Sequence, residues 1–434
     1  MENESTHLSQ NLWERWGFTG DPFDTNPLPI NYGSGLSVVT AYIARGGVLD
    51  PGSVMRNFFK NPGGGRIVVE GEPGVGKTTF VNYHRYEWEF QAKPPLLSPV
   101  SHISVQKDWE EEDFLLSLLS SLSARIRLEM KEKQAAKDPL LKEVSAITGV
   151  QLEEDGELSL SLTIAGTGAG VNQPRKSAVK VGKMTAIDLR SYLSRLVTKV
   201  RQKLGYAGVI FHLDNLELLK QKDETRLRQF FEDIRDTTQE PHVYFIFVGY
   251  KGMYQEVIVP APRVRSIFFD KPLNIEPLSV KQVHEIIAKR YELLAGPRKR
   301  WIKPVEDAVI DHYYETFEGK IRYVMNAVTS LVSHLPDSYA ETLTMDKAGE
   351  LLRAIQMSEI SARLSKVEIE VFLAAVGLRR FTPTALGKAT GKSKQLIQKY
   401  LKTLLECRYL THAEKVGRSQ YYEVEPRFQI LAPD

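Results

Sequence analysis

A glycine-rich segment early in the chain has the residue types and the spacing of a phosphate-binding loop. It runs Gly71-Glu72-Pro73-Gly74-Val75-Gly76-Lys77-Thr78, the pattern of Gly, four residues, Gly, Lys and Ser or Thr. Glycines let successive backbone N–H groups turn inward around phosphate oxygens, where a side chain would obstruct the approach. In this chemistry the lysine reaches the β- and γ-phosphates of a nucleotide, and the threonine hydroxyl binds Mg²⁺. We therefore expect ATP and Mg²⁺ as cofactors, with the nucleotide held by Gly71, Glu72, Pro73, Gly74, Val75, Gly76, Lys77, Thr78 and Thr79.

A second group of chemistry-bearing residues ends the apolar run Val209-Ile210-Phe211-His212-Leu213-Asp214. Mg²⁺ beside a phosphate loop requires an acidic residue at the end of a neighbouring strand. Asp214 fits that position, so Thr78 and Asp214 are the predicted metal ligands. His212 lies inside the run and is predicted to be a packed core histidine rather than a catalytic group.

The elements that must position these residues alternate between strands and helices. Strands are expected over 66–70, 103–105, 208–213 and 242–248, and helices over 77–90, 114–133, 186–203 and 224–237. Such alternation favours a parallel sheet with helices on both faces. The pattern breaks between about residues 137 and 183, where alternating side chains at 158–164 and a run of glycines predict a hairpin or a flexible insertion.

Composition excludes several classes of protein. A chain of 434 residues predicts two or three domains at roughly 150 residues each, and 42% hydrophobic with 26% charged residues is typical of a soluble globular protein. The single cysteine, Cys407, excludes an intramolecular disulfide, and the nine histidines lack metal-ligand spacing. The first residues are polar and lack the basic start and apolar core of a signal peptide, and no apolar run approaches the roughly 18 residues of a membrane span. We expect a cytoplasmic protein with no membrane partner.

The net charge of +3 conceals an uneven distribution. From Ser361 onward there are 13 basic and 7 acidic residues, against 44 basic and 47 acidic residues before it. A basic terminal segment therefore follows a mildly acidic body.

This basic segment has the pattern of a winged helix-turn-helix. A helix is expected over 365–378, a second one starts at Thr382-Pro383, and a third is capped by Ser393. Two strands, 409–413 and 420–424, follow, and the third helix of this arrangement normally enters the major groove of DNA. A buried stripe is expected on that helix at Leu396, Ile397, Tyr400, Leu401, Leu404 and Leu405. The predicted DNA contacts are Arg379, Arg380, Lys394, Gln395, Gln398, Lys399, Lys402 and Arg418. Winged helices also bind proteins, and lysines on an exposed face are often merely solvated.

The phosphate loop and Asp214, about 140 residues apart and followed by a helical segment and a basic terminal module, resemble AAA+ ATPases of the initiator type. Archaeal and eukaryotic origin recognition proteins are of this type, and bacterial ATPases of transposition and of antiphage defence are also similar. The resemblance implies an α/β fold: a P-loop NTPase (AAA+) parallel sheet, a helical lid and a C-terminal winged helix-turn-helix. The implied domains are an AAA+ core over 1–275 with an insertion at about 137–183, a lid over 276–355 and a winged helix over 361–434.

The resemblance also assigns residues to catalytic roles. Members of the family usually place Glu directly after the Walker B aspartate, but here Asn215 follows, so the nearest carboxylate, Glu217, is expected to act as the base unless the protein is a slow nucleotide switch. The position of an arginine finger from a neighbouring subunit falls first at Arg265 and second at Arg263, against the alternative of solvated loop arginines. Gly319-Lys320-Ile321-Arg322 matches the sensor 2 pattern, in which Arg322 would contact the γ-phosphate.

Two further positions remain open between function and packing. The sensor 1 position falls near Tyr250, where a structural tyrosine is favoured over a phosphate contact. The aromatic lead-in, with Trp16, Phe18 and Phe23, resembles a segment that closes over the nucleotide base, and core packing explains it equally well.

Two functions fit these observations. In the first, ATP held between subunits of a homo-oligomer drives assembly on duplex DNA and hydrolysis resets it, as in replication initiation, helicase loading or transposition targeting, with a helicase or transposase as protein partner. In the alternative, the protein is a nucleotide-gated oligomeric scaffold that regulates an effector such as a nuclease in antiphage defence, and the winged helix binds protein.

Overall fold

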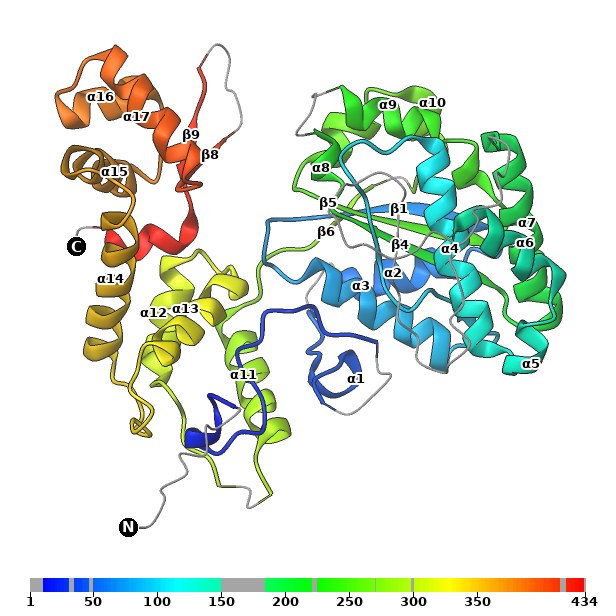
Figure 1. Cartoon of the computed structure of the whole chain (residues 1–434), viewed down its shortest axis with the longest axis horizontal. Helices are drawn as coiled ribbons and strands as arrows, with labels where there is room; N and C mark the ends of the chain where they lie inside the picture. The colour runs from blue at the N-terminus through cyan, green and yellow to red at the C-terminus, as the bar shows by residue number, and fades with distance from the viewer. Residues whose placement is uncertain are drawn as a thin grey trace, which may run out of the picture. The chain divides into compact units, whose positions relative to one another are not determined.

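The computed structural model describes residues 11–30, 35–46, 50–149, 184–220, 225–269, 271–297, 300–413 and 419–432. The chain divides into two compact units, traced in Figure 1. We call Pro27–Glu276 the sheet unit, and Met1–Asn26 together with Pro277–Asp434 the helical unit. Arg418 and the predicted hairpin at 158–164 lie outside the described residues.

The sheet unit is built on a parallel sheet, as predicted. Its strands are β1 (Gly64–Glu70), β2 (Leu96–Leu97), β3 (Ile103–Ser104), β4 (Gly208–Asp214), β5 (Val243–Gly249) and β6 (Leu273–Asn274). The order is β2-β4-β5-β1-β6, with β3 also pairing with β4, and every pairing is parallel. The carboxyl ends of β1 and β4 therefore lie at the same edge of the sheet.

Helices cover both faces of this sheet. They are α1 (Val38–Ala41), α2 (Pro51–Phe59), α3 (Lys77–Tyr86), η2 (Glu87–Gln91), α4 (Glu111–Glu129), α5 (Glu132–Ala135), α6 (Pro139–Thr148), α7 (Ala186–Lys203), α8 (Glu217–Lys220), α9 (Arg226–Asp233), η3 (Thr237–Gln239), η4 (Tyr254–Ile258) and α10 (Pro262–Arg265). Alternate residues of each strand point to opposite faces. One set packs with α2 and α3, and the other packs with α4, α7 and α9 (Figure 1).

Most predicted elements of the sheet unit are confirmed, with corrections at their ends. The helix expected over 77–90 is α-helical only to Tyr86 and continues as a π-helix, η2. The helix expected from residue 114 begins at Glu111, because a capping box joins Glu110 and Asp113. The start of the predicted insertion is also ordered: Asp138 caps α6, which buries Leu141 and Val144 in the core.

The helical unit contains η1 (Glu14–Trp16), α11 (Val280–Leu294), α12 (Asp307–Thr316), α13 (Ile321–Ser333) and α14 (Met345–Ser361). The aromatic lead-in packs against these helices and therefore falls in the helical unit, not in the sheet unit that contains the phosphate loop. Phe18 stacks on Tyr291 with ring centroids 5.1 Å apart, and Trp16 donates to the carbonyl oxygen of Glu341 at 3.1 Å. Trp16, Phe18 and Phe23 are all buried, which favours core packing over contact with a nucleotide base.

The C-terminal module (residues 365–432) also belongs to this unit. It contains α15 (Lys366–Leu378), β7 (Arg380–Phe381), α16 (Pro383–Thr390), α17 (Lys394–Glu406), β8 (Leu410–His412), β9 (Tyr422–Val424) and η5 (Pro426–Leu431). Thr382 and Ser393 cap α16 and α17 as predicted. Ser365, predicted to lie inside the first helix, precedes α15 and forms a capping box with Glu368. The strands form an antiparallel sheet in the order β7-β9-β8, and the two-residue strand β7 was not foreseen.

The buried stripe of α17 is narrower than the sequence suggested. Ile397, Leu401 and Leu404 are buried, whereas Tyr400 and Leu405 are half-buried. Leu396 is 44% exposed, so its assignment to the buried stripe is wrong. Over the described part of the chain, every helix is too short or too polar to cross a lipid bilayer.

Candidate nucleotide site and charged face

The phosphate loop joins β1 to α3, and its backbone has the left-handed turns that only glycine adopts readily. Gly74 and Gly76 have φ angles of 82° and 90°, and Gly76 is the residue before α3. Lys77 Nζ donates hydrogen bonds to the carbonyl oxygens of Gly71 at 2.8 Å and Glu72 at 3.0 Å. The loop therefore curls around the ammonium group. A phosphate bound by the loop would lie next to this group.

The sheet brings the two predicted metal ligands into contact. Thr78 Oγ1 donates to Asp214 Oδ2 at 2.7 Å, although the two residues are 136 positions apart. A hydroxyl and a carboxylate are oxygen ligands of the kind that Mg²⁺ takes beside substrate phosphates. Within the described ranges no cluster of three or more His, Cys, Asp or Glu residues could hold a metal by itself. Thr78 and Asp214 therefore have the donor chemistry to hold a Mg²⁺ ion, which would offset the charge of bound phosphates.

The residue after Asp214 has a local structural role. Asn215 has a φ of 63°, a left-handed conformation that Asn tolerates better than most residues. Its backbone N–H donates to Asp214 Oδ1 at 2.8 Å, and its Nδ2 donates to Ser104 Oγ at 2.7 Å. Asn215 thereby fastens the end of β4 to the end of β3. Glu217 begins α8 two residues later with an exposed side chain.

Two other side chains at this edge are structural. His212 is 1% exposed, and burial lowers its pKa well below the usual value for histidine, so it is the core histidine that the sequence predicted. Tyr250 donates its hydroxyl proton to Glu256 Oε2 at 2.7 Å. Burial, and then the carboxylate of Glu256, raise the pKa of Tyr250, which favours the structural interpretation of this tyrosine.

Sequence reasoning missed a buried carboxylate beside the loop. Glu70 ends β1 directly before Gly71, is 4% exposed, and accepts a hydrogen bond from the backbone N–H of Tyr254 at 3.0 Å. The sequence signal was a carboxylate directly after the three apolar residues Ile67, Val68 and Val69 of the predicted strand. Its role is to tie the start of the loop to η4.

The predicted catalytic arginines lie on exposed surfaces of different elements. Arg263 and Arg265 are exposed on α10 in the sheet unit. Arg322 is the second residue of α13 in the helical unit and is also exposed, and Gly319 at φ 74° makes the turn before this helix. The structure thus brings together the loop, Thr78 and Asp214, whereas the three arginines remain predictions.

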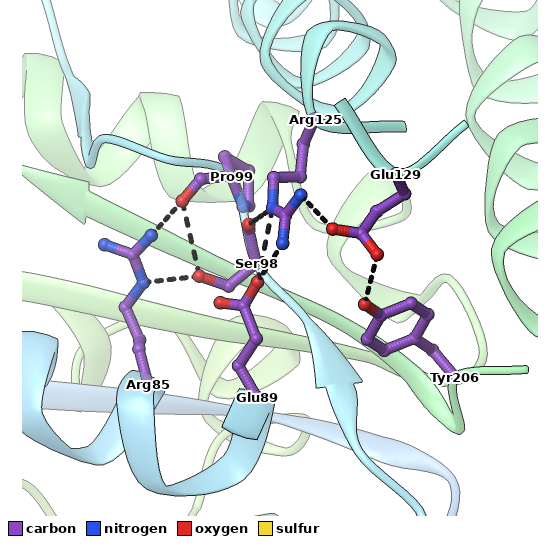
Figure 2. A network of polar contacts seen from close by, with 7 residues as sticks. All are labelled: Arg85, Glu89, Ser98, Pro99, Arg125, Glu129 and Tyr206. Atoms are coloured by element: carbon purple, nitrogen blue, oxygen red, sulfur yellow. Dashed lines mark hydrogen bonds and ion pairs between the residues drawn. The ribbon is translucent and has the colours of Figure 1, made fainter. Parts of the chain in front are cut away.

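A buried polar network lies at the far end of α3 (Figure 2). Arg125 of α4 donates to Glu89 Oε1 at 2.6 Å and to the carbonyl oxygen of Ser98 at 3.1 Å. Arg85 of α3 donates to Ser98 Oγ at 2.8 Å, and Arg125 also pairs with Glu129, which accepts from Tyr206 at 2.7 Å. The network joins the helix that begins at the phosphate loop to α4 and to the segment after β2.

Replacing Glu89 with Gln is expected to lower the free energy of unfolding of the sheet unit by about 3 kcal/mol or more. Removal of one partner leaves the charge of Arg125 buried with less compensation, and such changes cost about 3–5 kcal/mol. Chemical denaturation followed by fluorescence would measure the change, since Trp88 and Trp109 lie in this unit. Glu143→Gln is the matched control, because its ion pair with Arg195 at 3.0 Å is exposed and worth at most about 1 kcal/mol. Equal effects of the two changes would contradict the role of the network.

The helix α17 presents a polar, basic face. Its exposed residues include Lys394, Gln395, Gln398, Lys399 and Lys402. The stretch 379–402 contains no acidic residue, but the fold supplies acidic neighbours from elsewhere. Arg379 lies 3.5 Å from Glu318, Arg380 lies 3.6 Å from Glu423, and Lys402 lies 3.9 Å from Glu406. The positive charges at both ends of the stretch 379–402 are therefore partly neutralised. The clearest basic surface of this stretch lies on the first two turns of α17.

Comparison with known proteins finds neither a family model nor a curated protein that matches. Solved structures do align along most of the chain. The ORC2 protein of Aeropyrum pernix, in ADPNP–ADP complexes, is 15% identical over 94% of this chain and 96% of its own, with a TM-score of 0.45. The Drosophila ORC bound to DNA is 11% identical over 96% and 90%, and a RuvB variant of Thermotoga maritima is 12% identical over 87% and 92%, each with a TM-score of 0.40. The parallel sheet, the phosphate loop that joins β1 to α3 and the contact between Thr78 and Asp214 together show that the chain has an α/β fold with a P-loop at the carboxyl edge of its sheet.

Proposed function

We propose that this protein binds and hydrolyses ATP with Mg²⁺ and that ATP binding drives its assembly, as a homo-oligomer, on duplex DNA. The observation that supports the nucleotide site best is the loop folded around Lys77 with Thr78 in contact with Asp214. Lys77 would contact the β- and γ-phosphates, while the backbone N–H groups of the loop and the start of α3 bind the remaining phosphate oxygens.

Hydrolysis needs a group that accepts a proton from the attacking water. Asn215 cannot accept it, and its amide is already bonded to Ser104. Glu217 is the nearest carboxylate along the chain, and its exposed side chain at the start of the short helix α8 is accessible to water. Arg265, Arg263 and Arg322 are proposed to stabilise charge on the transferred phosphoryl group, the first two from a neighbouring subunit.

Replacing Glu217 with Gln is expected to lower steady-state phosphate release by about 100-fold or more, because a general base contributes roughly 10²–10⁴-fold to the rate. ATP affinity should change little, since the residue acts on water and not on the nucleotide. Release of inorganic phosphate at saturating ATP measures the effect. Glu232→Gln, an exposed change on α9, is the control. An unchanged rate in the Glu217 variant would show that the assignment of the base is wrong.

The C-terminal module is proposed to act as a winged helix that places α17 in the major groove. The order of its helices and its three-stranded sheet agree with this arrangement, and the exposed lysines and glutamines of α17 suit contacts to phosphates and base edges. Association of the intact protein with duplex DNA at low salt, with and without ATP, tests this proposal. Absence of binding in both conditions would contradict it.

The alternative function is a nucleotide-gated scaffold whose module binds an effector protein. One observation favours it: Leu396 is 44% exposed between Gln395 and the buried Ile397 on α17. An exposed apolar side chain within a polar face suits the core of a protein interface, which is more apolar than its rim. DNA binding that is retained by Leu396→Ser but lost on removal of the lysines would favour DNA over protein as the partner.

A further inference from the structure

Arg45 lies against the phosphate loop, although no motif in the sequence points to it. Its guanidinium donates hydrogen bonds to the backbone carbonyl oxygens of Val75, within the loop, and of Glu276, just after β6. Its Nη2 lies 3.2 Å from the position that a Cβ atom on Gly76 would occupy. Burial lowers the pKa of Arg45 from the usual value for arginine, but a guanidinium remains charged in proteins. A half-buried cation is thus fixed on the backbone of the loop.

The geometry of a peptide bond gives this contact a consequence for phosphate binding. The bond between Val75 and Gly76 is trans and planar, so the carbonyl group of Val75 and the N–H of Gly76 point in opposite directions. A guanidinium that holds the carbonyl on one side therefore directs the N–H to the other. A cation on the carbonyl also polarises the peptide group, which makes its N–H a stronger donor.

The segment that carries Arg45 is itself fastened to α3. The backbone N–H of Leu28 donates to Thr79 Oγ1 at 3.2 Å, and Asn82 Nδ2 donates to the carbonyl oxygen of Leu28 at 2.9 Å. Tyr42 stacks on Tyr83 with centroids 4.0 Å apart and ring planes 16° apart. The segment that positions Arg45 against the loop is thus anchored on α3, the helix that begins at the end of the same loop.

We propose that Arg45 is a positioning residue of the nucleotide site. Its guanidinium holds the peptide between Val75 and Gly76 so that the N–H of Gly76 faces the phosphates, and its charge adds attraction for a nucleoside di- or triphosphate. The inference rests on the proposed function of the loop as a nucleotide site. It adds a cation contributed from outside the phosphate-loop motif.

The test compares Arg45→Met and Arg45→Lys in the full-length chain, with binding of ATP and of ADP measured by calorimetry. Methionine keeps an apolar stem but removes the charge and every donor, so affinity for both nucleotides is expected to fall about tenfold, the equivalent of 1.4 kcal/mol. Lysine restores the charge but not the planar two-pronged guanidinium that reaches both carbonyl oxygens, so it should recover part of the loss. In steady-state hydrolysis, KM for ATP should rise while kcat stays within about twofold. Arg195→Met, an exposed arginine on α7, is the matched control.

The outcomes separate this inference from the function on which it rests. If the unmodified protein binds ATP and Arg45→Met binds it equally well, the role of Arg45 is overturned while the nucleotide site stands. If the unmodified protein binds no ATP, the proposed function fails and the role of Arg45 fails with it. Thermal unfolding without nucleotide controls for loss of structure. If Arg45→Met does not fold, the test rests on the folded Arg45→Lys variant. The proposal is then overturned if that variant binds ATP as tightly as the unmodified protein. It is also overturned if kcat of that variant falls without a rise in KM.

Discussion

Replacing Lys77 with Ala is expected to raise the dissociation constant for ATP by about 30-fold or more and to abolish phosphate release. The ammonium group of Lys77 is held inside the loop by the carbonyl oxygens of Gly71 and Glu72, from which it can turn to phosphate oxygens. Truncating one partner of a hydrogen-bonded charge pair costs about 2–5 kcal/mol, and each 1.4 kcal/mol is a factor of ten in affinity.

Calorimetry with ATP and thermal unfolding with and without ATP would both report this change. A ligand at about 100 times its dissociation constant stabilises the folded state by about 2.7 kcal/mol, so ATP should raise the unfolding temperature of the unmodified protein and raise that of Lys77→Ala by about a third as much or less. Lys133→Ala, an exposed change on α5 in the same unit, should behave as the unmodified protein. Retention of tight ATP binding by Lys77→Ala would refute the phosphate-loop assignment and the proposed function with it.

The double change Lys394→Gln and Lys399→Gln should weaken binding to duplex DNA for all sequences alike. Both lysines are exposed in the first two turns of α17. Each phosphate contact that is lost lowers the slope of log affinity against log salt by about one. The slope should therefore fall by about two, and affinity should fall most at low salt.

Binding of duplex DNA measured over a series of salt concentrations gives both quantities. The matched control is Lys281→Gln with Lys347→Gln, which removes the same charge from exposed positions on α11 and α14 of the same unit. ATP hydrolysis without DNA should be unaffected by either double change. If the two double variants lose affinity and slope equally, α17 does not carry the DNA contacts, and the scaffold function becomes the better account.

Much of the fold could be predicted because its signals are local. Strand β4 and helix α7 follow from runs of apolar residues and their periodicity, and the capping residues Thr382 and Ser393 indicate where α16 and α17 begin. Element ends were less predictable. The change from α-helix to π-helix after Tyr86 has no sequence signal of its own and is accompanied by the buried ion pair between Glu89 and Arg125.

The assignment of the lead-in shows where sequence order misleads. Trp16, Phe18 and Phe23 precede the phosphate loop along the chain, so they were assigned to the core domain with it. Their burial depends on partners such as Tyr291 and the carbonyl oxygen of Glu341, hundreds of residues away. A cluster of aromatic residues in a sequence indicates that these residues belong to a hydrophobic core, but it does not indicate which elements of the fold form that core.

The sequence by itself determined the phosphate loop, the aspartate at the end of β4 and the basic terminal module, because each is written in residue types at short, fixed spacings. Only the tertiary structure decided which distant groups meet: Thr78 with Asp214, Arg45 with the carbonyl of Val75, and Glu318 with Arg379. Those contacts depend on how strands and helices pack, since the register of the sheet and the path of each connecting segment set which side chains come within hydrogen-bond reach. Spacing along the chain therefore identified the residues of the predicted nucleotide site and of the basic module. Packing determined which further groups contact those residues, either adding to their function or neutralising their charge.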